Sequence, residues 1–278
     1  MWELTKLTAA EFSRFRDFIY AETGIQMQDG KITLLSNRIR RRLKKVGLDS
    51  FDDYYTQLTS GKLPNELEHF IDAVTTNETH FFRHGTHFEW FEGPFLDDLV
   101  ARARAGRHDR SLRIWSAACS SGEELATLAI CLTEASAKLA GWQISLLGTD
   151  ISETALAAAR EGRYPRRSLE HVSPERLRRH FKADASGEHW VLRPQLRELS
   201  EFRRHNLLER LPGPRHDVVL VRNVMIYFDR ESKKAAVRNL LSAVAPGGFL
   251  VVGSADGIFD LLEGLEKQST FVYRKPDV

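Results

Sequence analysis

Two short apolar runs end at positions that could bind the sugar of a nucleoside. Leu112–Ala118 and Ile144–Asp150 both have the pattern of buried strands, and the second ends on a carboxylate, Asp150. In an open α/β sheet, ligands lie beyond the carboxyl ends of the strands, where the strand order reverses. A carboxylate there can accept hydrogen bonds from the two hydroxyls of a ribose. The pattern therefore predicts that Asp150 binds the ribose of a nucleoside-containing ligand.

The loop after the first of these strands indicates which ligand that is. Ala117–Gly122 consists of small residues that let a ligand approach the backbone, and it leads into a helix that starts with Glu123 and Glu124. A phosphate site needs free N–H groups and positive charge, usually from several glycines and a lysine. This acidic loop instead tolerates a sulfonium or an amino group, which favours S-adenosylmethionine over NAD or ATP. Stabilisation of the helix N-terminus explains the two glutamates equally well.

The composition excludes several other classes of protein. Lys and Arg number 40 and Asp and Glu number 38 in 278 residues, so the charge is too balanced for a strong nucleic-acid binder. The 2 cysteines are too few for a disulfide scaffold or a four-cysteine zinc site. No apolar run resembles a signal peptide or approaches the length of a membrane span. We therefore expect a cytoplasmic protein that does not insert into membranes.

The first 75 residues or so have the pattern of helices joined by short turns. Thr8 followed by Glu11 is a capping-box signal, and Ser50 marks the start of a later helix. Between them, residues 32–46 are apolar at helical spacing, and that helix is expected to end at Gly47. The other face of this helix carries a basic block: Arg38, Arg40, Arg41, Arg42, Lys44 and Lys45.

From about residue 110, apolar strands alternate with helices. We expect further strands at Asp217–Arg222 and Phe249–Gly253, the latter after a turn at Pro246-Gly247-Gly248, and an edge strand at Thr270–Arg274. Such alternation implies βαβ crossovers and a mostly parallel sheet that is covered on both faces. The fold class is therefore α/β, with a doubly wound, Rossmann-like sheet.

The alternation breaks between about residues 163 and 205. Short strands there surround a turn at Asp184–Gly187, which predicts a small antiparallel β insertion. The expected strands are Phe181–Lys182, His189–Arg193 and Leu199–Phe202. We thus expect a helical domain over residues 1–75 and a ligand-binding domain over residues 76–278 that carries the insertion.

Three segments resemble motifs of the CheR family of chemotaxis methyltransferases. Thr75–Arg83 (TTNETHFFR) resembles the family's TTN-x-T-x-FFR stretch, and Trp115–Glu124 (WSAACSSGEE) is similar to its WSAA-x-S-x-GEE loop. Arg222–Phe228 (RNVMIYF) is similar to a third stretch of the family, and together with the helical N-terminal region the resemblance covers nearly the whole chain. The chain departs from the family at Leu125, where Pro is common, and at Cys119, where a small residue is common.

The resemblance implies a class I methyltransferase fold, S-adenosylmethionine as methyl donor and S-adenosylhomocysteine as product. It implies that glutamate side chains of chemoreceptors are the substrate. The implied cofactor-binding residues are Asn77, Thr79 and Arg83 at the methionine end, Glu123 at the amino group, Asp150 at the ribose, Asn206 and Leu207 beside the adenine, and Arg222 and Asn223 closing the pocket. The implied catalytic residues, which would orient the incoming carboxylate, are Arg83 and Tyr227.

The resemblance also implies two partner surfaces. The basic block would meet the acidic cytoplasmic helical bundle of a chemoreceptor, although a solvated face is the usual meaning of such a block. In some family members the β insertion takes the C-terminal tail of a receptor as an added strand, and the hairpin predicted here is compatible with that. We expect a monomer that is recruited to receptor arrays and does not bind nucleic acid.

Two other functions remain open at this point. One is a small-molecule or nucleic-acid methyltransferase of the same fold, although RNVMIYF lacks the Asn/Asp-Pro-Pro-Tyr/Phe pattern of amino-methylating enzymes. The other is a non-catalytic module that keeps S-adenosylmethionine only as a ligand.

Two features that suggest other chemistry are better explained by packing. His80, His84 and His87 are spaced like the ligands of a metal face, but no carboxylate or cysteine lies in register, so we expect no metal. Cys119 precedes a helix, where a thiol can be activated, but no general base is identifiable nearby. We therefore interpret Cys119 as a small loop residue.

Overall fold

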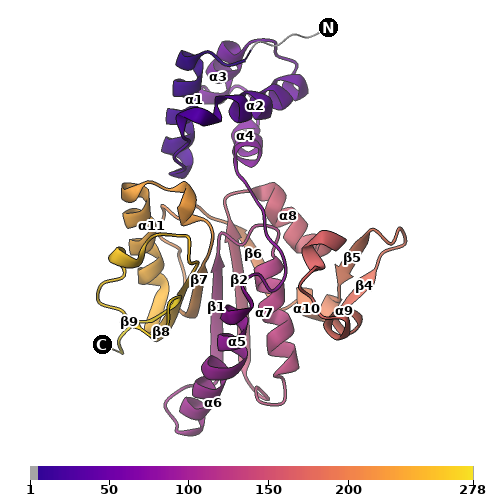
Figure 1. Cartoon of the computed structure of the whole chain (residues 1–278), viewed down its shortest axis with the longest axis vertical. Helices are drawn as coiled ribbons and strands as arrows, with labels where there is room; N and C mark the ends of the chain where they lie inside the picture. Colours follow the sequence, from indigo (N-terminus) through magenta and orange to yellow (C-terminus); the bar gives the residue numbers. More distant parts are fainter. Residues whose placement is uncertain (1–5, 278) are drawn as a thin grey trace.

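The computed structural model describes residues 6–277, which form a helical region and a larger α/β region (Figure 1). The N-terminal helices are α1 (Ala9–Thr23), α2 (Ile32–Val46), α3 (Phe51–Thr59) and α4 (Glu66–Val74), with a short 3-10 turn at Asp29–Lys31. In Figure 1 they form a bundle at one end of the molecule, and α6 lies at the opposite end. Over residues 6–277, no helix has the length and apolar character needed to cross a membrane.

The ends of the N-terminal helices follow from local sequence. The Thr8 side chain accepts the N–H of Glu11, and the Glu11 carboxylate accepts the N–H of Thr8 at 2.7 Å, which confirms the predicted capping box. Ser50 accepts the N–H of Asp53 at the start of α3. Gly47 ends α2 with φ +74°, a left-handed conformation that costs glycine little.

One member of the predicted basic block, Arg42, lies in the core of the bundle rather than on its surface. Its guanidinium donates to the buried Glu66 carboxylate at 2.9 and 2.6 Å, and the Tyr54 hydroxyl donates to the same carboxylate. A buried arginine requires such a partner, because an unpaired charge in the core is strongly destabilising. The expectation that the whole block lies on the outer face of α2 is therefore wrong at Arg42.

The α/β region contains a doubly wound sheet with the strand order β6-β2-β1-β7-β8-β10-β9. Its strands are β1 (Ser111–Ala117), β2 (Gln143–Asp150), β6 (Ser200–Arg204), β7 (His216–Val221), β8 (Val244–Val252), β9 (Glu266–Lys267) and β10 (Val272–Arg274). The strands from β6 to β8 are parallel, whereas β10 and β9 are antiparallel. The order reverses at β1, since β2 lies on one side of it and β7 on the other, and this confirms the predicted fold class.

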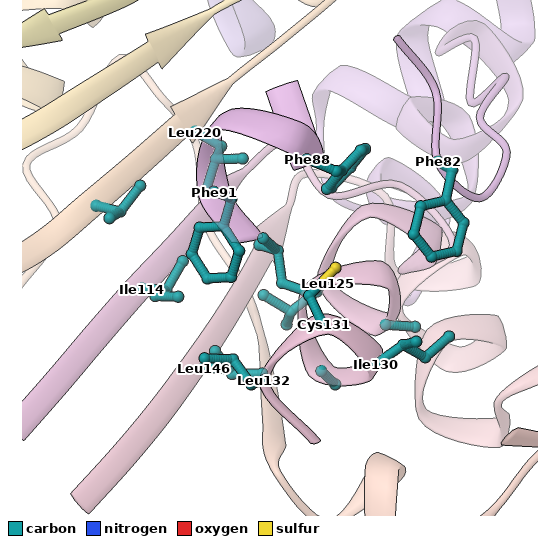
Figure 2. Close-up of a cluster of buried hydrophobic side chains, with 14 of the residues drawn as sticks. Phe82, Phe88, Phe91, Ile114, Leu125, Ile130, Cys131, Leu132, Leu146 and Leu220 are labelled. Carbon is teal, nitrogen blue, oxygen red and sulfur yellow. The ribbon is translucent and has the colours of Figure 1, made fainter. Parts of the chain in front are cut away.

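Helices cover both faces of this sheet, because side chains of each strand point alternately to opposite faces. The helices are α5 (Gly85–Trp90), α6 (Leu96–Arg104), α7 (Glu123–Glu134), α8 (Glu153–Glu161) and α11 (Arg230–Ala243). On one face, Ile114 of β1 joins a cluster with Phe91 and Leu125, shown in Figure 2. On the other face, the neighbouring Trp115 packs in a cluster with Leu240 of α11. This packing fixes the strand ends relative to the N-termini of the helices.

A small antiparallel sheet, with the order β3-β5-β4, projects beside α8. Its strands are β3 (Arg163–Pro165), β4 (Phe181–Ala183) and β5 (His189–Leu192), accompanied by α9 (Pro174–His180) and α10 (Pro194–Arg197). The strand predicted at Leu199–Phe202 does not belong to it, which is a correction. Those residues lie largely in β6, which pairs in parallel with β2 from Leu146↔Ser200 to Asp150↔Arg204. Phe202 packs on Gly148, where an added Cβ would lie 2.7 Å from the ring, so it extends the main sheet.

Two predictions at the other edge of the main sheet need correction. The predicted edge strand at Thr270–Arg274 is β10, but β9 pairs with its outer side, so β10 is not the edge. Strand β8 begins at Val244, before the predicted turn, and the register against β7 shifts across that turn. Gly248 fits this irregularity because a Cβ there would lie 2.9–3.1 Å from three carbonyl oxygens.

Candidate active site

A cleft of about 530 Å³ lies between the N-terminal helices and the carboxyl ends of β1, β2 and β7. Its lining residues come from segments within residues 23–38, 74–83, 118–124, 150–151, 205–207 and 222–228. This is the point where the strand order reverses, which is where ligands bind in open α/β sheets. The cleft therefore lies where the sequence placed the ligand.

The structure brings most of the predicted site residues to this one cleft, although they come from distant parts of the chain. The predicted residues that line it are Asn77, Thr79, Arg83, Asp150, Asn206, Leu207, Arg222, Asn223 and Tyr227. Their shared location supports a common site, and the role of each residue stays a prediction.

Asp150 is held at the end of β2 by two loops. One carboxylate oxygen accepts the N–H of Ser120 at 2.8 Å, and the other accepts the N–H of Ser152 at 2.9 Å. The side chain is buried, and this burial raises the pKa of the Asp150 carboxyl above its ordinary value. Each oxygen keeps a second lone pair, so the fixed carboxylate can still accept a hydrogen bond from a sugar hydroxyl.

The loop after β1 has an unusual backbone that follows from its small residues. Ala118, Ser120 and Gly122 have φ of +60°, +52° and +87°. For the two residues that are not glycine, this left-handed conformation costs about 1–3 kcal/mol each, and such strain is common at ligand-binding sites. Gly122 is required for a second reason, because a Cβ there would lie 2.8 Å from the Cβ of Ala159.

Glu123 is the one predicted site residue that the structure does not bring to the cleft. Its side chain is buried, accepts a hydrogen bond from the Ser121 hydroxyl at 2.7 Å, and has a pKa that burial raises. Glu124 lines the cleft instead and pairs with Arg222 at 2.6 Å. Successive helix positions point about 100° apart, so the two glutamates have different surroundings. The structure therefore does not place Glu123 in the lining of the cleft, and its predicted contact with the amino group stays a prediction.

Arg222 connects three parts of the site. Its guanidinium donates to Glu124 and to the backbone carbonyl of Arg83, and it lies 5.5 Å from the centre of the Phe88 ring. Because its side chain is almost fully buried, Arg222 fixes its neighbours in place. The Arg83 side chain is more accessible and donates to the carbonyl of Glu78 at 3.0 Å.

Asp256 positions the segment that carries Asn223 and Tyr227, and sequence reasoning missed it. The Asp256 carboxylate is 0% exposed and accepts the N–H groups of Asn223, Met225 and Gly253 at 2.9, 3.0 and 2.9 Å. Asn223 has φ +59°, so these bonds hold a strained turn. The only signal in the sequence was a carboxylate close behind an apolar strand.

The N-terminal helices close the cleft from the other side. The Arg38 guanidinium lines the cleft and donates to the carbonyl of Val74 and, at 3.0 Å, to the hydroxyl of Thr76. The N–H of Gln26 donates to the carbonyl of Tyr227 at 2.8 Å. Tyr227 is therefore fixed at the boundary between the two regions, and the sequence had assigned Arg38 only to the basic block.

Comparisons with known proteins agree with this geometry. The family model described as "CheR methyltransferase, SAM binding domain" matches residues 77–273, and that described as "CheR methyltransferase, all-alpha domain" matches residues 10–75. The chain belongs to the CheR methyltransferase family. The chemotaxis protein methyltransferase of Salmonella typhimurium is 36% identical over 98% of this chain and 92% of its own length. Chemotaxis protein methyltransferase 2 of Pseudomonas aeruginosa is 37% identical over 90% of this chain and 87% of its own length.

Membership in this family makes S-adenosylmethionine the cofactor and methyl transfer the chemistry of the cleft. The donor set fits such a group. The carboxylates of Glu124 and Asp150 suit an amino group and a ribose, and the strained loop at residues 118–122 presents small side chains to the ligand. The family match thus confirms the predicted cofactor, S-adenosylmethionine.

Proposed function

We propose that this protein is a protein-glutamate O-methyltransferase that esterifies glutamate side chains of chemoreceptors. The observation that carries the proposal is that the cofactor cleft adjoins a cationic helix, with Arg38, Arg83 and Tyr227 lining it. Such a cleft suits a carboxylate substrate, and the relatives are chemotaxis protein methyltransferases. In this proposal residues 1–75 bind the receptor and residues 76–278 bind the cofactor and catalyse the transfer.

The chemistry needs orientation more than acid–base catalysis. A glutamate with an ordinary pKa of about 4.3 is already an anion at neutral pH, so no general base is required. Bound S-adenosylmethionine supplies a methyl group activated by a sulfonium. A new C–O bond forms as the C–S bond breaks with its electron pair on sulfur, which leaves a methyl ester and S-adenosylhomocysteine. Holding the two reactants in line can contribute about 7–11 kcal/mol.

We assign the cofactor contacts by the position of each residue in the cleft. Asp150 would accept the ribose hydroxyls, and Glu124 rather than Glu123 would bind the amino group. Asn206 and Leu207 would flank the adenine, with the Asn206 amide held by the carbonyl of Glu22 at 2.9 Å. The remaining predicted contacts at the methionine end and the mouth of the pocket are Asn77, Thr79, Arg83, Arg222 and Asn223.

Arg83 and Tyr227 would orient the substrate carboxylate. Arg83 supplies a charge that attracts the anion, and the Tyr227 hydroxyl supplies a hydrogen bond without fully neutralising the nucleophile. A tight ion pair alone would lower the nucleophilicity of the carboxylate, so sharing the carboxylate between the two groups favours reaction.

The exposed cations of α2 would bind an acidic receptor helix. Arg41 and Lys45 are exposed and lie on the same side of α2 as Arg38, at spacings of three and four residues. Reversing Arg41 and Lys45 to Glu should raise KM for receptor several-fold and leave cofactor affinity unchanged, because surface attraction acts over about 8–10 Å in physiological salt. The matched control reverses Arg104 and Arg107, exposed cations at the end of α6 and just after it. Equal KM values for the two double variants would mean that the basic block is exposed to solvent and does not bind the receptor.

A receptor tail would bind at the small sheet. β3 and β4 are the edge strands of that sheet, so a peptide could add a strand there. Calorimetric titration with the C-terminal peptide of a cognate receptor tests this, and the absence of binding would remove the tail from the proposal. We propose that the protein acts as a monomer.

The proposed substrate is tested by locating the methyl groups. The protein would be incubated with the cytoplasmic fragment of a chemoreceptor and S-adenosylmethionine, and the fragment analysed by mass spectrometry. Methyl groups on glutamate side chains support the proposal. Methylation at nitrogen, or only of small molecules or nucleic acid, would overturn it.

A further inference from the structure

Two large apolar side chains at the reaction cleft reach solvent. Within residues 6–277, Leu34 is 42% exposed and Ile226 is 46% exposed, and both line the cleft. Tyr20 and Phe259 are also exposed, at 36% and 43%, but neither lines the cleft. Isolated exposed apolar residues need no explanation, whereas two at the rim of one cleft form a candidate contact surface.

The two residues come from opposite sides of the cleft and each lies next to a residue proposed to meet the substrate. Leu34 lies on α2, one helical turn before Arg38. Ile226 lies in the 3-10 turn Met225–Tyr227 and directly precedes Tyr227. An apolar contact at this pair would therefore be made close to the carboxylate that reacts.

The pattern of α2 indicates the kind of partner that fits. Leu34, Arg38, Arg41 and Lys45 follow one another at spacings of four, three and four residues, which places them in one row along the helix. Rows of this spacing pack against another helix, as in coiled coils. Three of the four positions are cationic and one is apolar, so the complementary helix is acidic and has an apolar side chain opposite Leu34.

We infer that Leu34 and Ile226 together bind an apolar side chain of the substrate helix that lies one helical turn from the methylated glutamate. The inference rests on the proposed function and adds a determinant of substrate choice to it. The cations along α2 set the charge of the partner, and the apolar pair sets which glutamate of an acidic helix reaches the cofactor. Glutamates without an apolar neighbour one turn away are then poor substrates.

Leu34→Asn and Ile226→Asn test this inference, with Phe259→Asn as the matched control of equal exposure outside the cleft. Each cleft variant should raise KM for a receptor fragment about five- to tenfold, the loss expected from a partly buried apolar side chain. The affinity for S-adenosylhomocysteine and the melting temperature should stay at the wild-type values. Leu34→Met and Ile226→Val should keep the wild-type KM.

The substrate side gives an independent readout. Serine in place of the apolar residue one turn from a methylated glutamate should raise KM for that site by a similar factor. Combined with Leu34→Asn, the serine substitution should add little, since both changes remove the same contact.

Several outcomes would overturn the inference. Wild-type KM in both cleft variants would do so, as would an equal rise in KM for Phe259→Asn. If the cleft variants instead converted a dimer to a monomer in sedimentation experiments, the pair would be a contact between two copies of this chain. If the wild-type protein methylated no receptor fragment, the proposed function itself would fail, which a wild-type control run in the same experiment distinguishes.

Discussion

Replacing Asp256 with asparagine should damage the active site through the backbone. In the wild type, the carboxylate accepts three N–H groups, from Asn223, Met225 and Gly253. An asparagine amide has one oxygen, so its NH₂ group must face at least one of these donors. Each lost hydrogen bond to a charged group costs about 1.5–3 kcal/mol, and removal of a buried charge offsets part of that loss. We expect a net loss of about 1–3 kcal/mol in the free energy of unfolding.

Asp256→Asn should also reduce activity in protein that remains folded. The turn that it loosens carries Asn223 and Tyr227, so kcat should fall at least about tenfold and cofactor affinity should weaken, with the protein still folded at assay temperature. Gly253→Ala should have the same effect by displacing the Asp256 carboxylate, because the added Cβ would collide with it. The control is Asp184→Asn, which removes a carboxylate from a turn in the small sheet.

The assays for this prediction are thermal unfolding, calorimetric titration with S-adenosylhomocysteine, and steady-state methyl transfer. If Asp256→Asn lowers the melting temperature but keeps wild-type kcat and cofactor affinity, Asp256 supports the fold and does not position the site. The same conclusion follows if Asp184→Asn reduces kcat and cofactor affinity as strongly as Asp256→Asn does.

Three further predictions address the cofactor, the substrate and pH. In calorimetric titrations, Asp150→Ala should weaken S-adenosylhomocysteine binding by about 1.5–3 kcal/mol. Glu124→Gln should also weaken it, whereas Glu123→Gln should not. Unchanged affinity in a folded Asp150→Ala variant would remove Asp150 from the site. Tyr227→Phe should lower kcat with nearly intact cofactor affinity, and a wild-type turnover number would make Tyr227 a packing residue. Burial lowers the pKa of His87 from 6.5 to about 4. The contribution of neutral His87 to the free energy of unfolding is therefore fully present above pH 6.5 and is lost as the pH falls from 6.5 towards 4. Urea unfolding should show a loss of about 2 kcal/mol between pH 7 and pH 5 that is absent in His87→Leu, and equal losses in both proteins would contradict this assignment.

Features set by local sequence were predictable. The capping box at Thr8, the end of α2 at Gly47 and the carboxylate at the end of β2 depend on residues a few positions apart, and all three are present. The inward position of Arg42 could also be predicted from the sequence. Arg42 lies three residues after Ile39 and seven after Leu35, on the apolar face of α2.

Features set by contacts between distant segments could not be predicted. Strand β6 is short and mostly charged, and only its pairing with β2 places it in the main sheet. The sequence could not choose between Glu123 and Glu124, because the choice depends on where α7 starts and how it is rotated. The Asp256 carboxylate accepts hydrogen bonds from the N–H groups of Asn223 and Met225, about 30 residues away in the sequence. No local sequence pattern indicates such a contact.

The most direct test of the proposed function is the chemical nature of the transferred methyl group. Receptor-containing membranes would be incubated with the protein and S-adenosylmethionine labelled in its methyl group, then treated with mild alkali. An ester is hydrolysed under these conditions, whereas an N-methyl group is stable. We expect labelled protein that releases its label as methanol. Label that resists alkali, or binding of the cofactor without any transfer, would contradict it.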